Sequence, residues 1–233
     1  MNRTLFLKGI RHGMPIALGY LSVSFAFGIQ AVGLGMTPMQ AVLISMTNVT
    51  SAGQLAGIEQ IARLAALVEV ALTQLTINLR YALMSLSLSQ KLDGTMGTLQ
   101  RMIFAFCNTD EIFAVASSQP GKVGRDYLYG LMLSPWIGWS LGTLLGAVAG
   151  MLLPMFFRTA LGIAIYGMFL AIILPPAREK KSVRLVVLLS AALSLAFRYV
   201  PVINRVPAGY VIILCAVAAA CVGAALYPVE ADA

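Results

Sequence analysis

Charged residues are scarce in this chain. Only 11% of its 233 residues are Asp, Glu, Lys or Arg, whereas 59% are hydrophobic, and the mean hydropathy is +0.86. A soluble domain carries about 25% charged residues, so this composition excludes a soluble globular protein. A bilayer core is roughly 30 Å thick and needs about 20 mainly apolar residues for each helical crossing. We therefore predict an all-α integral membrane protein with a single transmembrane domain over residues 1–233.

Histidine and cysteine are also scarce, which limits the chemistry that the chain can perform. The one histidine, His12, stands beside Arg11 at a predicted membrane edge, and the three cysteines, Cys107, Cys215 and Cys221, lie in apolar surroundings. An odd number of cysteines inside predicted helices indicates buried thiols and no disulfide framework. There is no HExxH pattern, and Cys107 has no evident base. We expect no enzyme activity, metal or cofactor, and no basic stripe indicates nucleic acid.

Proline and glycine divide the chain into apolar segments that are candidates for membrane helices. The segments cover residues 14–35, 38–58, 61–89, 100–118, 127–152, 159–174, 184–200 and 207–227. The second contains SMTNVTSAGQ, which is too polar to face lipid, so it either crosses inside a bundle or re-enters. The sequence predicts a bundle of seven to eight transmembrane helices, with a broken or re-entrant polar segment near 47–57.

Basic residues concentrate at the N-terminus, in loop 118–126 and in loop 175–184. With eight crossings all three regions fall on one side, and such an excess is typical of cytoplasmic loops. If segment 38–58 does not cross, the N-terminal charges change sides and the excess disappears. The pattern therefore favours eight crossings, a cytoplasmic N-terminus and a lipid bilayer with anionic headgroups around the basic residues.

Two stretches of the sequence resemble each other. GMPIALGYLSVSFAFGIQAVGLGMTP and LSPWIGWSLGTLLGAVAGMLLP are Gly- and Ala-rich, and each is opened and closed by proline; downstream, NLRY around Arg80 is echoed by AFRY around Arg198. Transporters are commonly built from two such halves, here 1–118 and 125–233. The halves would be parallel with eight crossings and inverted if segment 38–58 re-enters. Chance similarity between membrane helices is the alternative.

A polar stripe runs along segment 61–89. Glu69, Thr73, Thr76 and Arg80 occur at spacings of 0, 4, 7 and 11, so they share one face of a helix, and that face cannot point to lipid. Arg80 either extends toward the membrane surface or belongs to a site inside the bundle.

Acidic residues occur in the middle of the apolar segment 100–118. Asn108 and Glu111 share a helix face, and Asp110 points about 100° away from Glu111. Carboxylates among phenylalanines should pair with cations or hold protons, and Arg80 is the most economical partner. The group is either an ion pair that fixes helix register or a site for substrate or protons.

Segment 38–58 supplies a third polar element, with side chains at helical spacing: Thr47, Thr50, Ser51 and Gln54. Their hydroxyl groups could satisfy backbone groups freed by a break near Ala52 and Gly53. A zwitterionic amino acid would suit such a place, with its carboxylate on freed N–H groups or Arg80 and its ammonium on an acidic side chain. Polar packing between helices is the alternative.

Three motifs resemble a known family. SAGQ at 51–54, NLRY at 78–81 followed by SLSLS at 85–89, and NTDEIFAV at 108–115 look like signature stretches of the AzlC family of branched-chain amino acid permeases, in the same order and at similar spacing. The resemblance implies an exporter of branched-chain amino acids in a bacterial inner membrane, working with a small, hydrophobic AzlD-type partner. Family members often have histidine where this chain has Tyr81, and a less polar lead into the glycine and glutamine of the first motif, so the amino acid transported is left open.

The motifs and the polar stripes together define a candidate site. The predicted substrate-binding residues are Ser51, Gly53, Gln54, Asn78, Arg80, Asn108, Asp110 and Glu111. Glu69, Asp110 and Glu111 are candidates for coupling or for ion pairs, and Phe104, Phe106 or Phe113 would shape a pocket for the substrate side chain. We expect alternating access, coupled to protons through a carboxylate. A membrane scaffold or assembly subunit, which needs a partner chain to transport, is the alternative function.

Overall fold

The computed structural model describes residues 2–154, 156, 167, 170 and 173–228. This part of the chain is helical and contains no β-strand, which confirms the all-α class. The predicted segment 159–174 lies largely outside the described residues. Four described helices are long and apolar enough to span a membrane, namely α1, α7, α9 and α10.

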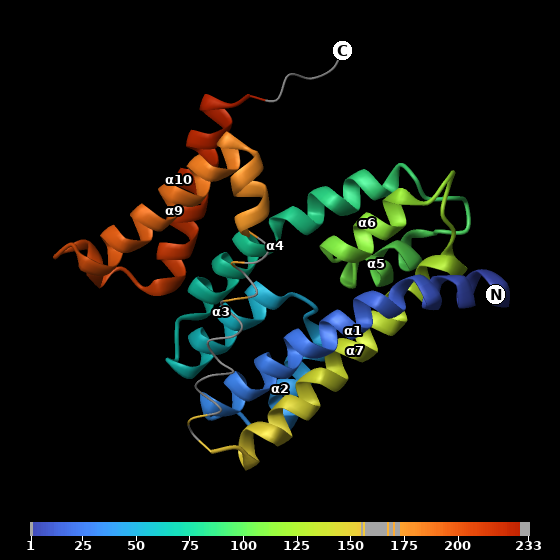
Figure 1. Cartoon of the computed structure of the whole chain (residues 1–233), viewed down its shortest axis with the longest axis horizontal. Helices are drawn as coiled ribbons and strands as arrows, with labels where there is room; N and C mark the ends of the chain where they lie inside the picture. The colour runs from blue at the N-terminus through green and yellow to red at the C-terminus, as the bar shows by residue number, and fades with distance from the viewer. Residues whose placement is uncertain (1, 155, 157–166, 168–169, 171–172, 229–233) are drawn as a thin grey trace.

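The helices have the following bounds (Figure 1): α1 (Arg3–Gly33), α2 (Pro38–Thr47), α3 (Ser51–Ala62), α4 (Leu67–Ser89), α5 (Thr98–Phe106), α6 (Asp110–Ser118), α7 (Arg125–Leu152), α9 (Lys181–Tyr199), the 3₁₀ turn η1 (Ile203–Arg205) and α10 (Ala208–Leu226).

The helices α1 and α7 run parallel and pack along their whole length (Figure 1). Gly138, Gly142, Gly146 and Gly150 recur at every fourth position of α7, and all four face α1. A Cβ built at Gly146 would collide with the backbone of Phe25. Small residues at this spacing let two membrane helices approach closely, so the glycine stripe holds the centre of the fold together.

Segment 38–58 is two helices instead of one. Thr37 and Gln40 form a capping box at the start of α2, and the backbone becomes extended at Asn48 and Thr50 before α3 begins. The predicted break is therefore present within 47–57, although it lies at residues 48–50 and not at Ala52 and Gly53.

Segment 100–118 is also divided, which the sequence analysis did not predict. The helix α5 ends at Phe106, and α6 begins at Asp110 after a link over residues 107–109. Asn108 therefore belongs to this link, so the expectation that Asn108 and Glu111 share a helix face was wrong. Asparagine and threonine readily bond to nearby backbone and favour such helix ends over helix interiors.

The α2–α3 hairpin enters and leaves at the same end of the bundle. Ser45 lies 2.6 Å from the Thr143 hydroxyl, and the Trp136 Nε1 donates to the Met46 carbonyl at 3.1 Å, so α2 descends from the C-terminal end of α7 to its middle. The helix α3 then returns antiparallel to α4. Contacts of 2.8 Å from Gln74 Nε2 to the Gly53 carbonyl and of 2.9 Å from Gln60 Nε2 to Thr73 Oγ1 join these two helices.

The α5–α6 hairpin enters and leaves at the opposite end of the bundle. The helix α6 runs parallel to α4, back to the end where α4 finishes, since Asn108 Nδ2 donates to Ser85 Oγ at 3.0 Å and Lys91 Nζ donates to the Ser117 carbonyl. The links 48–50 and 107–109 thus meet near the middle of the bundle. Segments 38–58 and 100–118 both turn back within the bundle, which is the shape that re-entry requires, and the number of membrane crossings stays a prediction.

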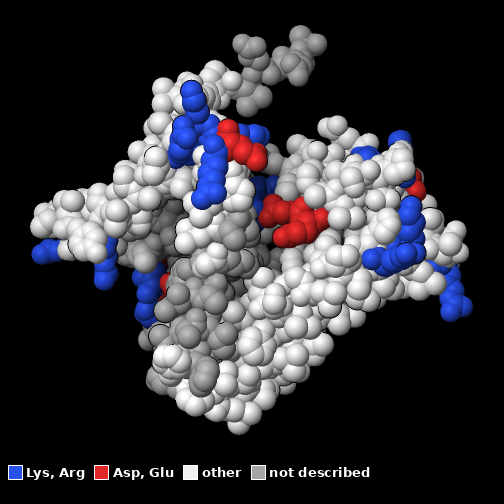
Figure 2. All heavy atoms as spheres, viewed as in Figure 1, with Lys and Arg blue, Asp and Glu red and all other residues white. Residues whose placement is uncertain are grey.

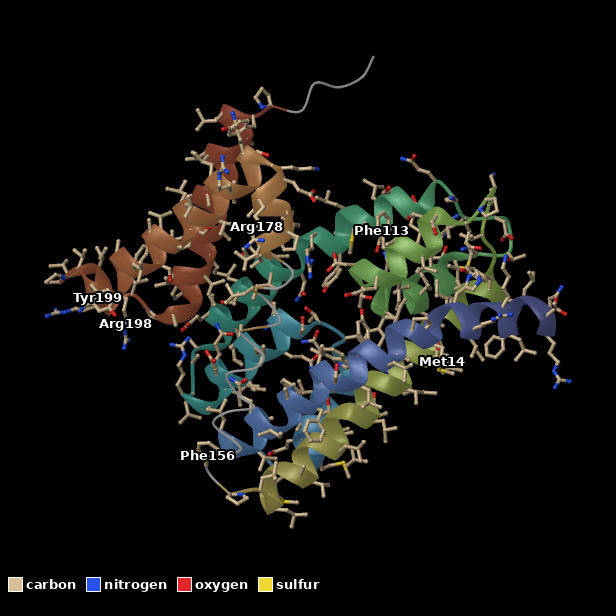
Figure 3. The ribbon with its side chains drawn as sticks, viewed as in Figure 1. Met14, Phe113, Phe156, Arg178, Arg198 and Tyr199 are labelled. Carbon is tan, nitrogen blue, oxygen red and sulfur yellow. The ribbon has the colours of Figure 1, made fainter. Side chains whose placement is uncertain are left out.

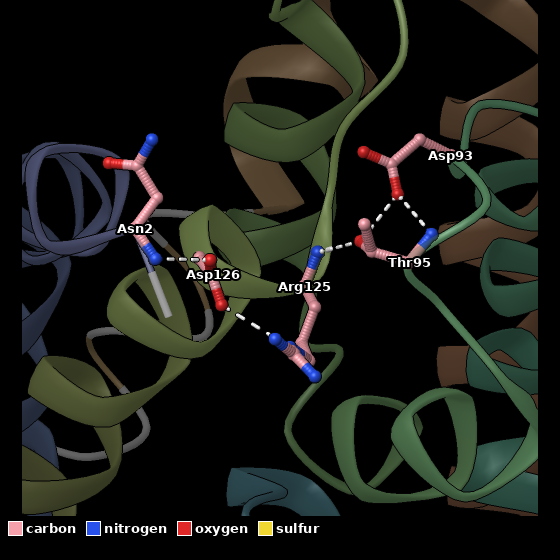
Figure 4. Close-up of polar contacts among 5 residues, drawn as sticks. All are labelled: Asn2, Asp93, Thr95, Arg125 and Asp126. Atoms are coloured by element: carbon pink, nitrogen blue, oxygen red, sulfur yellow. Dashed lines mark hydrogen bonds and ion pairs between the residues drawn. The ribbon is translucent and has the colours of Figure 1, made fainter.

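Polar contacts gather three chain segments at one end of the bundle (Figure 4). The Asn2 backbone N–H donates to Asp126 at 2.5 Å, and the Arg125 backbone N–H donates to Thr95 Oγ1 at 2.9 Å. If both hairpins re-enter, the number of membrane crossings between the N-terminus and loop 118–126 falls by two. These two regions therefore remain on the same side. Most basic residues of α1 to α7 lie at this end: Arg3, Lys8, Arg11, Lys91, Arg101, Lys122 and Arg125.

This arrangement makes a topology prediction. We expect single cysteines at Asn2 and Thr95, in a variant without Cys107, Cys215 and Cys221, to react with an impermeant thiol reagent from the same side of the membrane. A cysteine at Leu64, in the exposed turn between α3 and α4, should react from the other side and serves as the control. Labelling of Asn2 and Thr95 from opposite sides would instead mean that segment 38–58 crosses the membrane.

The helices α9 and α10 form a separate antiparallel pair, and α10 packs against α4 (Figure 1). No residue of α9 is buried, and Arg198 and Tyr199 lie at the far end of this pair (Figure 3). The proposed echo of Arg80 by Arg198 therefore brings no second arginine to the centre of the bundle. The two-repeat organisation remains a prediction.

Candidate functional site

A cavity of about 550 Å³ opens where α1, α3, α4, α6 and α7 meet. It contains four of the predicted site residues, Ser51, Arg80, Asp110 and Glu111. The other residues that line it are Pro15, Ile16, Gly19, Tyr20, Ser22, Val23, Val49, Tyr81, Thr109 and Trp139. Figure 2 shows acidic atoms gathered at the middle of the visible face, where the surface is hollowed, whereas many of the basic atoms lie toward its rim.

Arg80 and Asp110 form an ion pair in this cavity, as the sequence analysis predicted. The Arg80 Nη1 lies 2.5 Å from Asp110 Oδ2, and 49% and 45% of the two side chains are exposed. Arg80 Nη2 also donates to the Tyr81 hydroxyl at 3.0 Å, and the guanidinium carbon lies 4.8 Å from the centre of the Tyr81 ring. The pair is therefore accessible to a solute that enters the cavity.

Glu111 points away from Asp110 and contacts α1. The Tyr20 hydroxyl donates to Glu111 Oε2 and lies 2.6 Å from Thr109 Oγ1. Sequence reasoning missed Tyr20, although a phenol in the middle of an apolar helix needs a polar partner and was a usable signal. The two adjacent carboxylates thus contact different helices, since Asp110 pairs with Arg80 of α4 and Glu111 accepts from Tyr20 of α1.

The N-termini of α3 and α6 both begin at the cavity. Neither helix has a side-chain cap, so their first N–H groups lack partners within the helix, and both carry the positive end of a helix dipole. Asp110 and Glu111 compensate this charge at α6. The first turn of α3 begins at Ser51 and contains no acidic residue, so it offers N–H groups to an external carboxylate.

Gln54 and Gly53 do not line the cavity. Gln54 is 1% exposed; its Nε2 donates to Ser45 Oγ at 2.8 Å, and its Oε1 accepts from Trp139 Nε1 at 2.8 Å. Both atoms of its amide therefore have partners inside the protein, and the predicted role of Gln54 in binding the substrate stays a prediction. Gln54 instead fixes Trp139, whose ring packs edge-on against Tyr20 at 5.1 Å.

Asn78 and Asn108 line a second, smaller cavity of about 110 Å³. Its walls come from the link 48–50, from α4 and from the link 107–109. Val49, Tyr81 and Thr109 line both cavities, so the two spaces adjoin. The structure thus divides the predicted site into a large space with charged residues and a small space with neutral polar residues.

Glu69 lies away from both cavities. It is 4% exposed, pairs with Arg63 at the end of α3, and accepts a hydrogen bond of 2.8 Å from the Gly209 N–H at the start of α10. Eleven residues of helix separate it from Arg80, about 16 Å at 1.5 Å per residue. Glu69 forms an ion pair as expected, but the pair holds α10 on the bundle and does not join Arg80.

The phenylalanines expected to shape the pocket are not on its wall. Phe104 and Phe106 belong to α5, which the break at 107–109 directs away from the large cavity, and Phe113 packs into the core from α6 (Figure 3). The apolar lining comes instead from Ile16, Val23, Val49 and Trp139.

Within the described part of the chain, no group of three or more His, Cys, Asp or Glu side chains could hold a metal ion. The ionisable groups of the large cavity are instead arranged for polar binding, with one cation and two carboxylates around an apolar interior.

Comparison with known proteins places these features in a family. The model of the AzlC protein family matches residues 15–153, which include α1 to α7 and both cavities apart from the first turns of α1. The inner membrane protein YgaZ of Escherichia coli strain K12 is 29% identical over 81% of this chain and 80% of its own length. An uncharacterised membrane protein of Archaeoglobus fulgidus is 32% identical over 73% of this chain and 75% of its own.

An uncharacterised membrane protein of Helicobacter pylori strain 26695 is 28% identical over 62% of this chain and 66% of its own length. No solved structure matches the chain significantly. The family match covers more than half of the chain and every residue that lines the large cavity. The chain belongs to the AzlC protein family.

Proposed function

We propose that the protein is a transmembrane permease that exports branched-chain or related amino acids by alternating access. The observation that carries the proposal is the large cavity, which combines an open ion pair, an uncapped helix N-terminus and apolar walls. Binding sites for small solutes are mostly apolar cavities with a few convergent polar groups, and this cavity has that character.

The ion pair matches the two charges of an amino acid. In the absence of substrate, Arg80 and Asp110 satisfy each other. An entering zwitterion can replace this contact, with its carboxylate on Arg80 and the first N–H groups of α3, and its ammonium on Asp110 or Glu111. Each charge then keeps a partner, so binding leaves no unpaired charge inside the bundle.

The apolar wall favours an aliphatic side chain. Ile16, Val23 and Val49 line the cavity beside Trp139, and burying apolar surface stabilises a complex by about 25 cal/mol for each Å². A leucine-sized side chain gains more from this wall than a serine side chain does. This preference supports the branched-chain class over polar amino acids.

The two hairpins suggest how access alternates. The α2–α3 hairpin closes the cavity from one end and the α5–α6 hairpin from the other, and discontinuous helices of this kind surround the central sites of many transporters. Moving one hairpin would open one side while the other stays closed. Glu111 or Asp110 would carry a proton across with this motion, which would couple export to the proton gradient.

The family membership supports a location in the bacterial inner membrane, with the basic end that contains Asn2 facing the cytoplasm. We further propose that a small, hydrophobic AzlD-type membrane protein assembles with this chain. The exposed apolar surface of α9 offers area for such a contact.

Reconstituted flux tests the proposal. Proteoliposomes that contain this chain, with and without the small partner, would be given labelled leucine, isoleucine, valine or serine under an imposed pH gradient. We expect leucine-class flux several times faster than serine flux, and a dependence on the gradient. Absence of leucine-class flux from both preparations, with folded protein, would contradict the permease function. Flux only in the presence of the partner, unaffected by changes at Arg80, would favour the scaffold function.

A further inference from the structure

Two residues that line the small cavity between the two hairpin links, Asn78 and Asn108, have side-chain oxygens that lack partners. Asn108 is 2% exposed, and its Oδ1 and the Oδ1 of Asn78 are both buried without a hydrogen bond among the described residues. A buried acceptor without a partner costs about 1–3 kcal/mol, so two of them on the wall of one cavity indicate an occupant. We propose that this cavity binds a monovalent alkali cation, with Na⁺ as the ion to test first.

The orientation of Asn78 follows from a chain of hydrogen bonds. The Gly53 carbonyl can only accept, so the Gln74 Nε2 must donate to it, at 2.8 Å. The Gln74 Oε1 then accepts from Asn78 Nδ2 at 3.1 Å. Asn78 therefore keeps its Oδ1 as the free atom. Because the orientation is set by a backbone carbonyl two hydrogen bonds away, it does not depend on an arbitrary choice between the nitrogen and oxygen of Asn78.

Asn108 presents its oxygen from the opposite hairpin. Its Nδ2 donates to Ser85 Oγ at 3.0 Å, which leaves Oδ1 unpaired. One unpartnered carboxamide oxygen thus comes from α4 and one from the link 107–109, on two residues that both line the cavity. Hydroxyl groups of Thr47, Thr50 and Thr109 complete a wall that is rich in neutral oxygen donors.

Two helix C-termini at the small cavity favour a positive charge there, whereas the first helical residues of α3 and α6, Ser51 and Asp110, line the large cavity. The helix α2 ends at Thr47 and α5 ends at Phe106, and both residues line the small cavity. The last carbonyl groups of a helix have no partner within it and carry the negative end of the dipole. Unwound backbone and helix C-termini are the elements that coordinate Na⁺ in transporters built from broken helices.

The oxygen ligands that the small cavity offers favour a monovalent ion. Sites for Ca²⁺ and Mg²⁺ normally include carboxylate ligands, and no Asp or Glu is among the described residues that line this cavity. Asp110 and Glu111 line the larger cavity instead. Neutral carboxamide, hydroxyl and carbonyl oxygens can replace the water shell of a monovalent cation. They compensate little of the hydration free energy that a divalent cation would lose.

The position of the site would couple the cation to the substrate, and this part of the inference rests on the proposed permease function. Tyr81 and Thr109 separate the two cavities, and Tyr81 contacts Arg80. Both links, 48–50 and 107–109, contribute to the wall, so a bound cation would hold the two hairpin tips together. The cation would therefore stabilise one arrangement of the hairpins and strengthen substrate binding.

Thermal unfolding of the purified chain in matched salts tests the binding site without any amino acid. At equal ionic strength, we expect Na⁺ to raise Tm by about 2–4 °C relative to N-methylglucamine, since a ligand that binds only the folded state stabilises it. Potassium and lithium arms show which alkali ion fits best. Equal Tm in all the salts, for protein that is folded, would show that the cavity holds water only and would overturn the proposal.

Variants locate the site. Asn108→Ala or Asn78→Ala should weaken the apparent Na⁺ affinity by about tenfold or more, whereas Asn78→Asp, which keeps an oxygen and adds a negative charge, should retain or strengthen it. Asn204→Ala, at an exposed asparagine of η1, is the matched control. A Na⁺ effect that is unchanged in both alanine variants would place the ion elsewhere. Sodium binding without leucine flux would contradict the permease function alone, and leucine flux without any sodium effect would contradict the cation site alone.

Discussion

Replacing Arg80 by alanine is expected to reduce leucine flux about 10- to 100-fold at an unchanged amount of protein in the membrane. Arg80 is the only basic side chain among the described residues that line the large cavity. A hydrogen bond to a charged group contributes about 1.5–3 kcal/mol, and each 1.4 kcal/mol corresponds to a factor of about ten in binding. The substitution also leaves Asp110 without its partner, which further disfavours the substrate-binding arrangement.

Arg198→Ala is the matched control for this change. Arg198 is also followed by a tyrosine, but it is exposed at the far end of the α9–α10 pair (Figure 3), so its loss should leave flux unchanged. The measurement is labelled leucine flux in proteoliposomes, normalised to reconstituted protein. Adding Asp110→Asn to Arg80→Ala should recover stability but not flux, because it removes the unpaired charge without restoring a carboxylate partner. Wild-type flux in Arg80→Ala would contradict the proposed role of Arg80.

The features that the sequence predicted correctly follow from the free-energy cost of leaving a charged or polar side chain without a partner in apolar surroundings. Arg80 and Asp110 lie 30 residues apart in segments that had to pair their charges, and few partners were available. The break in segment 38–58 was predicted for the same reason, since its hydroxyl and amide side chains could not face lipid. In both cases the apolar composition leaves a single economical solution.

The second break could not be predicted by this reasoning. Residues 107–109 contain no proline or glycine, and the apolar pattern continues on both sides, so the segment looks like one helix. This single omission produced two errors, since it placed Asn108 on the wrong face and assigned the phenylalanines of α5 to the cavity wall. The charge bias was a weak guide here, because two re-entrant hairpins leave the N-terminus and loop 118–126 on the same side, as two crossings do.

The sequence analysis also did not identify hydrogen-bond partners that lie far apart in the chain. Glu69 accepts from Gly209, which is 140 residues away, and Gln54 accepts from Trp139, 85 residues away. Periodicity showed that these side chains are polar and buried, but it cannot choose among the many donors that a bundle offers. The roles of Glu69 and Gln54 as fixed structural links therefore emerged only from the packing of α10 and α7.

The packing of α1 against α7 gives the second large expected effect. We expect Gly146→Leu to lower the free energy of unfolding by about 3 kcal/mol or more. The added side chain would meet the backbone of Phe25, which is part of a continuous helix and cannot move aside as a flexible side chain would. Separating α1 from α7 would also displace Tyr20 and Trp139, which come from these two helices and line the cavity. The readouts are the yield of monodisperse protein after extraction and its Tm.

Gly33→Leu is the control for this substitution, because Gly33 is exposed at the end of α1 and nothing lies within 4 Å of its built Cβ. It adds the same apolar side chain to the same helix pair, so its yield and Tm should stay close to those of the wild type. If Gly146→Leu and Gly33→Leu behave alike, the close approach of α1 and α7 is not what holds the fold. If only Gly146→Leu fails, the glycine stripe of α7 is the element on which the cavity depends, since both walls that carry Tyr20 and Trp139 are placed by that contact.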